Sequence, residues 1–194
     1  MHGLINRAIQ CFVRDTYGED CWLAVARDAG IDPPRFEAML TYDDTLTDDV
    51  LAALGASLSK PQEELCEDIG TYLVSHPNTE AVRRLLRFGG ATFEEFLQSL
   101  EDLPDRARMA VPDLELPQLE LRECGRDLFC LMCKADHPCF ACALLGILRT
   151  MADDYGALVC LDFVEKGPGR DLIKISLVEG TFAEGRSFEL GAGL

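Results

Sequence analysis

The chain contains 194 residues with a formal net charge of −16, and 48% of its residues are hydrophobic. That length is enough for one sizeable core, and the strong negative charge argues against nucleic acid or an anionic membrane as partner. No apolar run reaches the length of a membrane span, and residues 1–10 lack the features of a signal peptide. We therefore expect a cytoplasmic protein whose cysteines meet reducing conditions.

The first half of the chain has the apolar spacing and the capping residues of helices. Helices are predicted at residues 3–17, 19–29, a short segment near Phe36, 47–58, 61–74, 79–86 and 92–103. Gly18 is expected to end the first helix, Thr47 to cap the fourth and Pro61 to open the fifth. A segment rich in proline follows, from Pro104 to Pro117.

From Leu119 the apolar residues alternate with a period of two, which is typical of strands. We expect strands around 119–124 and 127–132, an apolar helix at 138–155, a hairpin of strands at 158–165 and 172–179, and a frayed tail after Gly185. This order predicts an α+β fold, with a helical N-terminal part followed by a short antiparallel sheet with a packed helix. We divide it into an N-terminal helical subdomain, 1–60, and a C-terminal α/β subdomain, 61–194, which form one functional domain.

Five of the nine cysteines fall between residues 124 and 142, spaced C-x5-C-x2-C-x5-C-x2-C. Two C-x2-C pairs joined by a short turn offer four thiolates, which suit a closed tetrahedral zinc site. We predict zinc bound by the following four residues: Cys130, Cys133, Cys139 and Cys142. Cys124 and His137 are alternative ligands.

Other interpretations of these cysteines stay open. The same ligands suit an iron–sulfur cluster, the thiols can form a reversible thiol–disulfide pair, or they can be inert. The scattered cysteines are interpreted as small buried hydrophobes: Cys11, Cys21, Cys66 and Cys160. We find no nucleophile–base arrangement, phosphate-binding glycine loop or distinct carboxylate pair, so an enzyme is not predicted.

Strings along nearly the whole chain resemble the heme-nitric oxide/oxygen binding (H-NOX) family of gas sensors. They are MHGLINRAIQCFV at the start, YGEDCW at 17–22, TYDD near 41, the helix 65–74, GGATFEEFLQSLEDL at 89–103, VPDLELPQLEL at 111–121 and LLGILRTMADDYG at 144–156. The resemblance implies a helical part and an α/β part that close over a buried heme. It also implies that ligand binding shifts the two parts and signals to a partner such as a histidine kinase or a cyclic-di-nucleotide enzyme.

The departures from the family pattern concern the heme itself. Pro104 stands where the family has its proximal histidine, and proline offers no ligand atom. The family's Tyr-x-Ser-x-Arg clamp for the heme propionates aligns with Cys133, Ala135 and His137, which lack the hydroxyls and the guanidinium. The resemblance places three further residues on the wall of a residual heme pocket: Ile5, Pro117 and Leu144. We therefore predict that ordinary heme binding is lost.

The sequence thus favours a heme-independent H-NOX-like sensor that uses the four-cysteine zinc site as a structural element and redox switch. Its partner is expected to be a signalling protein with a basic face, because the chain is strongly acidic. Two alternatives remain. One is a heme-based gas sensor with an unusual axial ligand, and the other is an interaction module in which zinc is only a staple.

Overall fold

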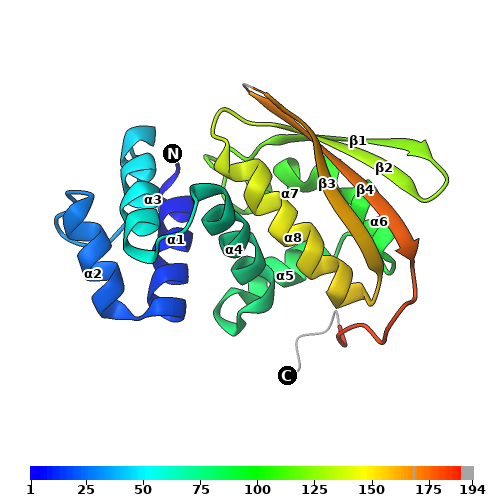
Figure 1. The fold of residues 1–194 in the computed structure, drawn as a ribbon, viewed down its shortest axis with the longest axis horizontal. Coiled ribbons are helices and arrows are strands. Elements are labelled where there is room, and N and C mark those ends of the chain that lie inside the picture. The colour runs from blue at the N-terminus through cyan, green and yellow to red at the C-terminus, as the bar shows by residue number, and fades with distance from the viewer. Residues whose placement is uncertain (168, 189–194) are drawn as a thin grey trace.

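The computed structural model describes residues 1–167 and 169–188 (Figure 1). The helices are α1 (Gly3–Tyr17), α2 (Glu19–Asp28), α3 (Asp44–Leu58), α4 (Gln62–Ser75), α5 (Glu80–Arg87), α6 (Phe93–Gln98), α7 (Leu103–Ala110) and α8 (Cys139–Tyr155). The strands are β1 (Gln118–Gly125), β2 (Leu128–Lys134), β3 (Leu158–Gly167) and β4 (Arg170–Glu179). Helices therefore precede a sheet that carries one long helix, and the predicted α+β class is confirmed.

The first three helices pack around one hydrophobic cluster, which we call the N-terminal cluster. It is built on Phe12, Trp22 and Leu51, which are almost fully buried, and it continues onto one face of α4. Phe36 also belongs to this cluster, but the predicted short helix around it is wrong. Its backbone N–H donates to the Gln10 side chain at 2.9 Å, so the irregular segment is satisfied without helical hydrogen bonds.

The helix predicted at 92–103 is instead divided into several pieces. Thr92 caps α6 through a capping box with Glu95, a 3₁₀ turn covers 99–102, and α7 begins at Leu103. Pro104 occupies the first turn of α7, where its missing N–H costs no helical hydrogen bond. The proline that suggested a stop therefore lies in the first turn of a helix that the sequence analysis missed.

The four strands form one antiparallel sheet in the order β1-β2-β4-β3. Along β2, alternate residues Phe129, Leu131 and Cys133 are buried in a second cluster, the C-terminal cluster. This cluster also takes in the buried face of α8 and the apolar residues of α6, including Phe96 and Leu97. The predicted hairpin is confirmed as β3 and β4, and the period of two correctly identified the strands.

Helices α4 and α8 lie side by side at the middle of the molecule (Figure 1). Their backbones approach so closely that a Cβ on Gly70 would lie 1.9 Å from the Ala143 carbonyl oxygen. A Cβ on Gly146 would lie 2.1 Å from the Glu67 carbonyl oxygen. Since α4 contributes to both clusters, it joins the two halves, and the subdomain boundary at residue 60 stays a prediction.

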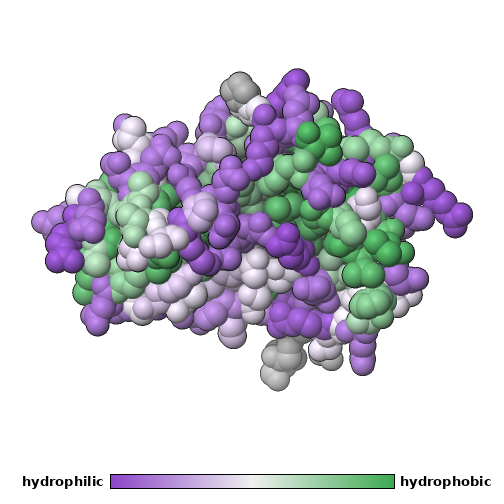
Figure 2. Space-filling view, in the orientation of Figure 1, coloured by the Kyte–Doolittle hydropathy of each residue, from purple (hydrophilic) through white to green (hydrophobic). Residues whose placement is uncertain are grey.

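The segment after β4 returns to the end of α8, so residues 185–188 are not frayed as expected. Arg186 donates its backbone N–H to the Asp154 carbonyl at 2.9 Å, and Arg83 donates to the Ser187 carbonyl at 3.2 Å. The rest of the predicted frayed tail, 189–194, lies outside the described residues. Hydrophilic side chains cover much of the face in Figure 2, as the charge of −16 requires, and hydrophobic ones gather toward the sheet.

Candidate functional site

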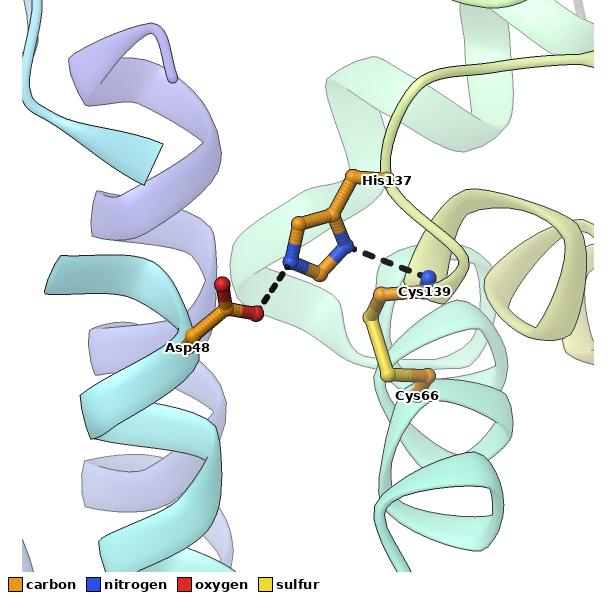
Figure 3. The surroundings of a disulfide bond; sticks show 4 residues. All are labelled: Asp48, Cys66, His137 and Cys139. Carbon is orange, nitrogen blue, oxygen red and sulfur yellow. Dashed lines mark hydrogen bonds and ion pairs between the residues drawn. A yellow bond between two sulfur atoms is a disulfide. The ribbon is translucent and has the colours of Figure 1, made fainter. Parts of the chain in front are cut away.

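A disulfide joins Cys66 of α4 to Cys139, the first residue of α8 (Figure 3). The two cysteines are 73 residues apart in sequence, and their Cα atoms are 5.3 Å apart. Cys66 is buried and Cys139 is half-buried. The bond therefore locks the beginning of α8 to the helix that is shared by both hydrophobic clusters.

His137 adds a second link next to this disulfide. Its Nδ1 accepts the backbone N–H of Cys139 at 3.2 Å, and its Nε2 lies 2.9 Å from a carboxylate oxygen of Asp48 on α3 (Figure 3). With Nδ1 as acceptor, the ring proton lies on Nε2 and is donated to Asp48. His137 is only 7% exposed, so this ring is buried at the junction.

A cavity of about 480 Å³ opens against the disulfide. Cys66, Cys139 and Cys142 line it together with apolar residues of α8 and β3. Its charged lining consists of Glu63, Asp136, Lys166 and Asp171. Lys166 donates to Glu63 at 2.6 Å, which raises the pKa of the lysine. Three acidic groups and one basic group give the cavity a negative balance.

Cys142, which lines this cavity, and Cys133, which does not, are free thiols. Burial raises the pKa of Cys142, and nearby Lys166 opposes the rise while Glu63, Asp171 and Glu67 add to it. Burial, followed by Asp171 and Cys142, raises the pKa of Cys133 to about 12. Both groups are therefore thiols at neutral pH, with little of the thiolate that metals and electrophiles require.

The structure disperses the predicted zinc ligands. Cys130 and Cys133 are three residues apart on β2 and so point to opposite faces of the sheet. Cys133 is buried in the C-terminal cluster, whereas the thiol of Cys130 contacts that of Cys124 on the other face, where burial and this neighbour raise its pKa to about 11. Cys139 is bonded to Cys66. Within residues 1–167 and 169–188, no group of three or more His, Cys, Asp or Glu is placed to hold a metal ion.

The remaining predicted residues do not gather around one space. Leu144 is 6% exposed within the C-terminal cluster, while Ile5 and Pro117 are half-buried. None of the three lines the cavity beside the disulfide. Of the three positions aligned with the propionate clamp, Cys133 is buried, Ala135 packs against the same cluster and His137 is engaged by Asp48.

These observations also test the fit of a heme. Pro104 is buried at the position of the expected axial ligand and has no donor atom. Among the described residues, each histidine has a local partner: His2 accepts from Leu4, His76 from Asn78, and His137 from Cys139. Around Leu144, the side chains of α6 and α8 pack against each other. The residues present do not fit a heme held by histidine in the ordinary way of the family.

Sequence reasoning missed Cys66, which it interpreted as an inert buried thiol. The residue lies on the apolar face of α4 with Leu65 and Ile69, a position that looks like ordinary core. The spacing of the cluster at 124–142 gave no sign of a partner 73 residues upstream. Two features of the sequence did point toward a disulfide. A reversible thiol–disulfide pair was one of the open interpretations, and Cys139 was expected at the N-terminus of a helix, where cysteines are more reactive.

A helical part is joined through one shared helix to a four-stranded antiparallel sheet, and a disulfide lies where the shared helix meets the helix on the sheet. The model of the family described as Haem-NO-binding matches residues 2–161, and the chain belongs to this family, H-NOX. The predicted resemblance is thereby confirmed. None of the described helices is long and apolar enough to cross a membrane.

Curated relatives and solved structures agree with this assignment. The chain is 25% identical over 154 residues to soluble guanylate cyclase gcy-31 of Caenorhabditis elegans, covering 79% of this chain and 22% of that protein. It is 22% identical over 158 residues to soluble guanylate cyclase 89Db of Drosophila melanogaster, covering 81% and 24% respectively. The chain thus spans about a quarter of the length of these relatives.

Solved H-NOX structures share the fold over most of the chain. An H-NOX protein from S. oneidensis superposes with a TM-score of 0.80 at 14% identity, covering 97% of this chain and 100% of that one. The Fe(II) unliganded H-NOX protein from K. algicida gives 0.78 at 18% identity, covering 95% and 100%. At this identity the likeness establishes the fold alone.

Proposed function

We propose that this chain is an H-NOX regulatory domain that works without heme and responds to the thiol redox state of its surroundings. The input is the Cys66–Cys139 bond between α4 and α8. The output is the position of the N-terminal half relative to the sheet, passed to a signalling partner. The single observation that carries the proposal is that this disulfide fastens the beginning of α8 to the helix shared by both clusters.

The chemistry of such a switch is simple. Forming the bond from two thiols transfers two electrons and two protons to an oxidant, such as a low-molecular-weight disulfide, which becomes two thiols. Disulfides exposed to a reducing thiol pool are rarely permanent and often serve as sensors. The cavity against Cys66 and Cys139 gives small thiols a route to the bond.

The zinc part of the original hypothesis has no support in the geometry, because its four cysteines lie in three different surroundings. We retain the hypothesis of a redox switch and assign it to the disulfide between Cys66 and Cys139. The partner is inferred from the family: the curated relatives are named guanylate cyclases, and a histidine kinase or cyclic-di-nucleotide enzyme is the other inferred class.

The redox proposal is tested by amide hydrogen exchange on the protein oxidised with glutathione disulfide and on the protein reduced with a phosphine. We expect faster exchange in residues 62–66 and 137–142 after reduction, with little change in β1 and β2. Cys66→Ser should behave as the reduced protein under both conditions. Cys21→Ser, which alters a free cysteine packed on the same cluster, is the matched control and should respond like the parent. Equal exchange in the two states of the parent would sink the proposal.

Heme independence is tested separately by reconstitution with hemin. We expect no five-coordinate histidine spectrum in the reduced protein and no stoichiometric nitric oxide complex, because Pro104 supplies no ligand. Pro104→His alone should restore little, since Ala135 and His137 still lack the groups that hold propionates. A sharp Soret band from the parent protein at one heme per chain would favour the alternative, a gas sensor with an unusual axial ligand.

A further inference from the structure

The first turn of α8 carries a second reactive feature, the sequence Cys139-Phe-Ala-Cys142. Residues three apart in a helix lie on the same face, with Cα atoms about 5 Å apart. That separation is within the range that a disulfide spans, as the 5.3 Å between Cys66 and Cys139 also is. A C-x-x-C pair at the beginning of a helix is a spacing that supports thiol–disulfide chemistry.

Two independent observations place Cys142 beside the existing bond. It lines the same cavity as Cys66 and Cys139, and it is buried in the N-terminal cluster that contains Cys66. The thiol is therefore directed toward α4 rather than toward the sheet alone. With the disulfide on one side and a free thiol one helical turn away, the cavity holds all three atoms that an exchange reaction needs.

We infer that Cys142 is the alternative partner of Cys139 and that this cavity is a thiol–disulfide exchange site. The Cys142 thiolate attacks Sγ of Cys139, a Cys139–Cys142 bond forms, and Cys66 leaves as a thiolate that takes up a proton. The number of disulfides is unchanged, so no external oxidant or reductant is consumed. This inference rests on the proposed function, because it gives the Cys66–Cys139 bond a way to open.

The exchange would replace a disulfide between α4 and α8 with a disulfide inside the first turn of α8. In the first form a covalent bond fastens α8 to α4. In the second the two helices keep their packing and the Arg149–Glu67 ion pair, and His137 still contacts Asp48 on α3. A mixed disulfide formed at Cys139 by a small disulfide compound would be resolved by the same attack from Cys142. Cys142 is therefore a resolving thiol, and the substrate class is a low-molecular-weight thiol or disulfide that fits the cavity.

The surroundings of Cys142 set the pH dependence of the exchange. Burial and the carboxylates of Glu63 and Glu67 on α4 and Asp171 on β4 raise the pKa of the thiol, while Lys166 on β3 opposes them. Asp136 in the loop before α8 also lines the cavity, and Cys133 on β2 is the neighbouring thiol. Since only the thiolate attacks, the rate should rise about tenfold per pH unit between pH 7 and pH 8.

The test is disulfide mapping by mass spectrometry on the folded chain, without external thiol, after an acid quench and blocking of free thiols. We expect the parent to show both bonds, with Cys66 becoming free to be blocked at the pH-dependent rate above. Cys142→Ser should show only the Cys66–Cys139 bond. Cys66→Ser, oxidised with glutathione disulfide, should form the Cys139–Cys142 bond rather than keep glutathione on Cys139. Cys21→Ser should match the parent.

The outcomes distinguish the proposed redox function from the proposed exchange by Cys142. If the parent never forms a Cys66–Cys139 bond, the proposed redox function fails, whereas the Cys66→Ser assay still decides whether Cys142 resolves Cys139. If the Cys66–Cys139 bond forms but the parent and Cys142→Ser have the same bond pattern, the exchange is overturned. Retention of glutathione on Cys139 in folded Cys66→Ser, with folding checked by circular dichroism, overturns it as well.

Discussion

His137 shows how much of the junction depends on single side chains. One ring nitrogen accepts the N–H of Cys139 at the beginning of α8, and the other donates to Asp48 on α3. The family pattern has a cation at this position that is directed at a cofactor, whereas here the ring is directed at a carboxylate of the same chain. Neither contact uses a cysteine sulfur, so His137 links the beginning of α8 to α3 through groups other than the disulfide.

The first prediction concerns this contact. Asp48→Ala removes the acceptor and leaves the buried Nε2–H of His137 without its partner, so we expect a loss of about 1 kcal/mol in the free energy of unfolding. Asp48→Asn keeps an acceptor and should lose less. Asp49→Ala, at the next residue of α3, is the control and should stay within about 0.5 kcal/mol of the parent. Denaturant unfolding of the reduced proteins measures all three, and equal losses for Asp48→Ala and Asp49→Ala would contradict the role of the contact.

At the scale of elements, the packing of α4 on α8 depends on two glycines that face the partner backbone. A methyl group on Gly70 would meet the Ala143 carbonyl, which belongs to the backbone and has little room to retreat. The close approach also brings Cys66 and Cys139 within bonding distance, because both are near the same crossing of the two helices. The close packing of α4 on α8 therefore contributes to stability and also brings the two cysteines of the redox site together.

We predict that Gly70→Ala destabilises the protein by about 2–4 kcal/mol, because the overlap forces the helices apart and opens the core between them. Gly180→Ala is the control, since a Cβ there meets nothing within 4 Å, and it should change the free energy of unfolding by less than about 0.5 kcal/mol. Thermal unfolding of the reduced chains provides the comparison. A stable Gly70→Ala that still forms the Cys66–Cys139 bond would show that the contact is not essential.

A third prediction concerns the contact between α1 and α4. The hydrogen bond from Tyr72, at 2.6 Å, and then that from Asn78, at 2.9 Å, hold the pKa of Asp15 below its usual value of 3.8. Because the unfolded chain binds this proton more readily, the stabilisation is present above about pH 3.8 and is lost as the pH falls through the lowered pKa.

Tyr72→Phe should therefore cost about 1 kcal/mol at pH 7 and progressively less below pH 4, as both proteins lose the charged acceptor. Tyr17→Phe is the matched control. Tyr17 packs on Phe12 within the same cluster, and its hydroxyl makes no hydrogen bond among residues 1–167 and 169–188. Urea unfolding between pH 3 and pH 7 measures the difference. A Tyr72→Phe effect that does not depend on pH would remove Asp15 from the explanation.

The sequence predicted most elements because apolar periods and most helix caps are local signals. The predicted cap Thr47 is wrong, since it lies inside α3, whose N-cap is Asp43. The bounds of α1 match the expectation, and α8 differs by one residue. The cysteine site was not predictable in the same way. Whether two thiols meet depends on which face of a strand or helix each one occupies, and Cys130 and Cys133 were assigned to one site although they point to opposite faces of β2. The contact of Cys66 with Cys139 depends on tertiary packing, which the spacing of the cysteines in the sequence does not reveal.

On the scale of the whole molecule, charge governs what can approach the junction. The chain carries a net charge of −16, and the cavity beside the disulfide has three carboxylates against one ammonium group. An anionic thiol must approach against this field, whereas a cationic thiol is attracted by it. The negative charge that disfavours nucleic acid as a partner should therefore also make cationic thiols reduce the disulfide faster than anionic thiols.

The last prediction follows from this selection. At low ionic strength, cysteamine should reduce the Cys66–Cys139 bond about threefold to tenfold faster than 3-mercaptopropionate, after each rate is divided by that for an uncharged model disulfide. The ratio should shrink toward one in 0.5 M salt, where the Debye length is only about 4 Å and the field of exposed carboxylates is screened.

Asp136→Asn removes one exposed charge of the lining and should lower the ratio, whereas Asp49→Asn, on α3 and outside the lining, should not. Rates are read from the appearance of the Cys66 thiol with every protein in the Cys142→Ser background, in which no internal exchange can release it. A ratio near one at low salt would mean that reductants reach the bond by a route other than this cavity.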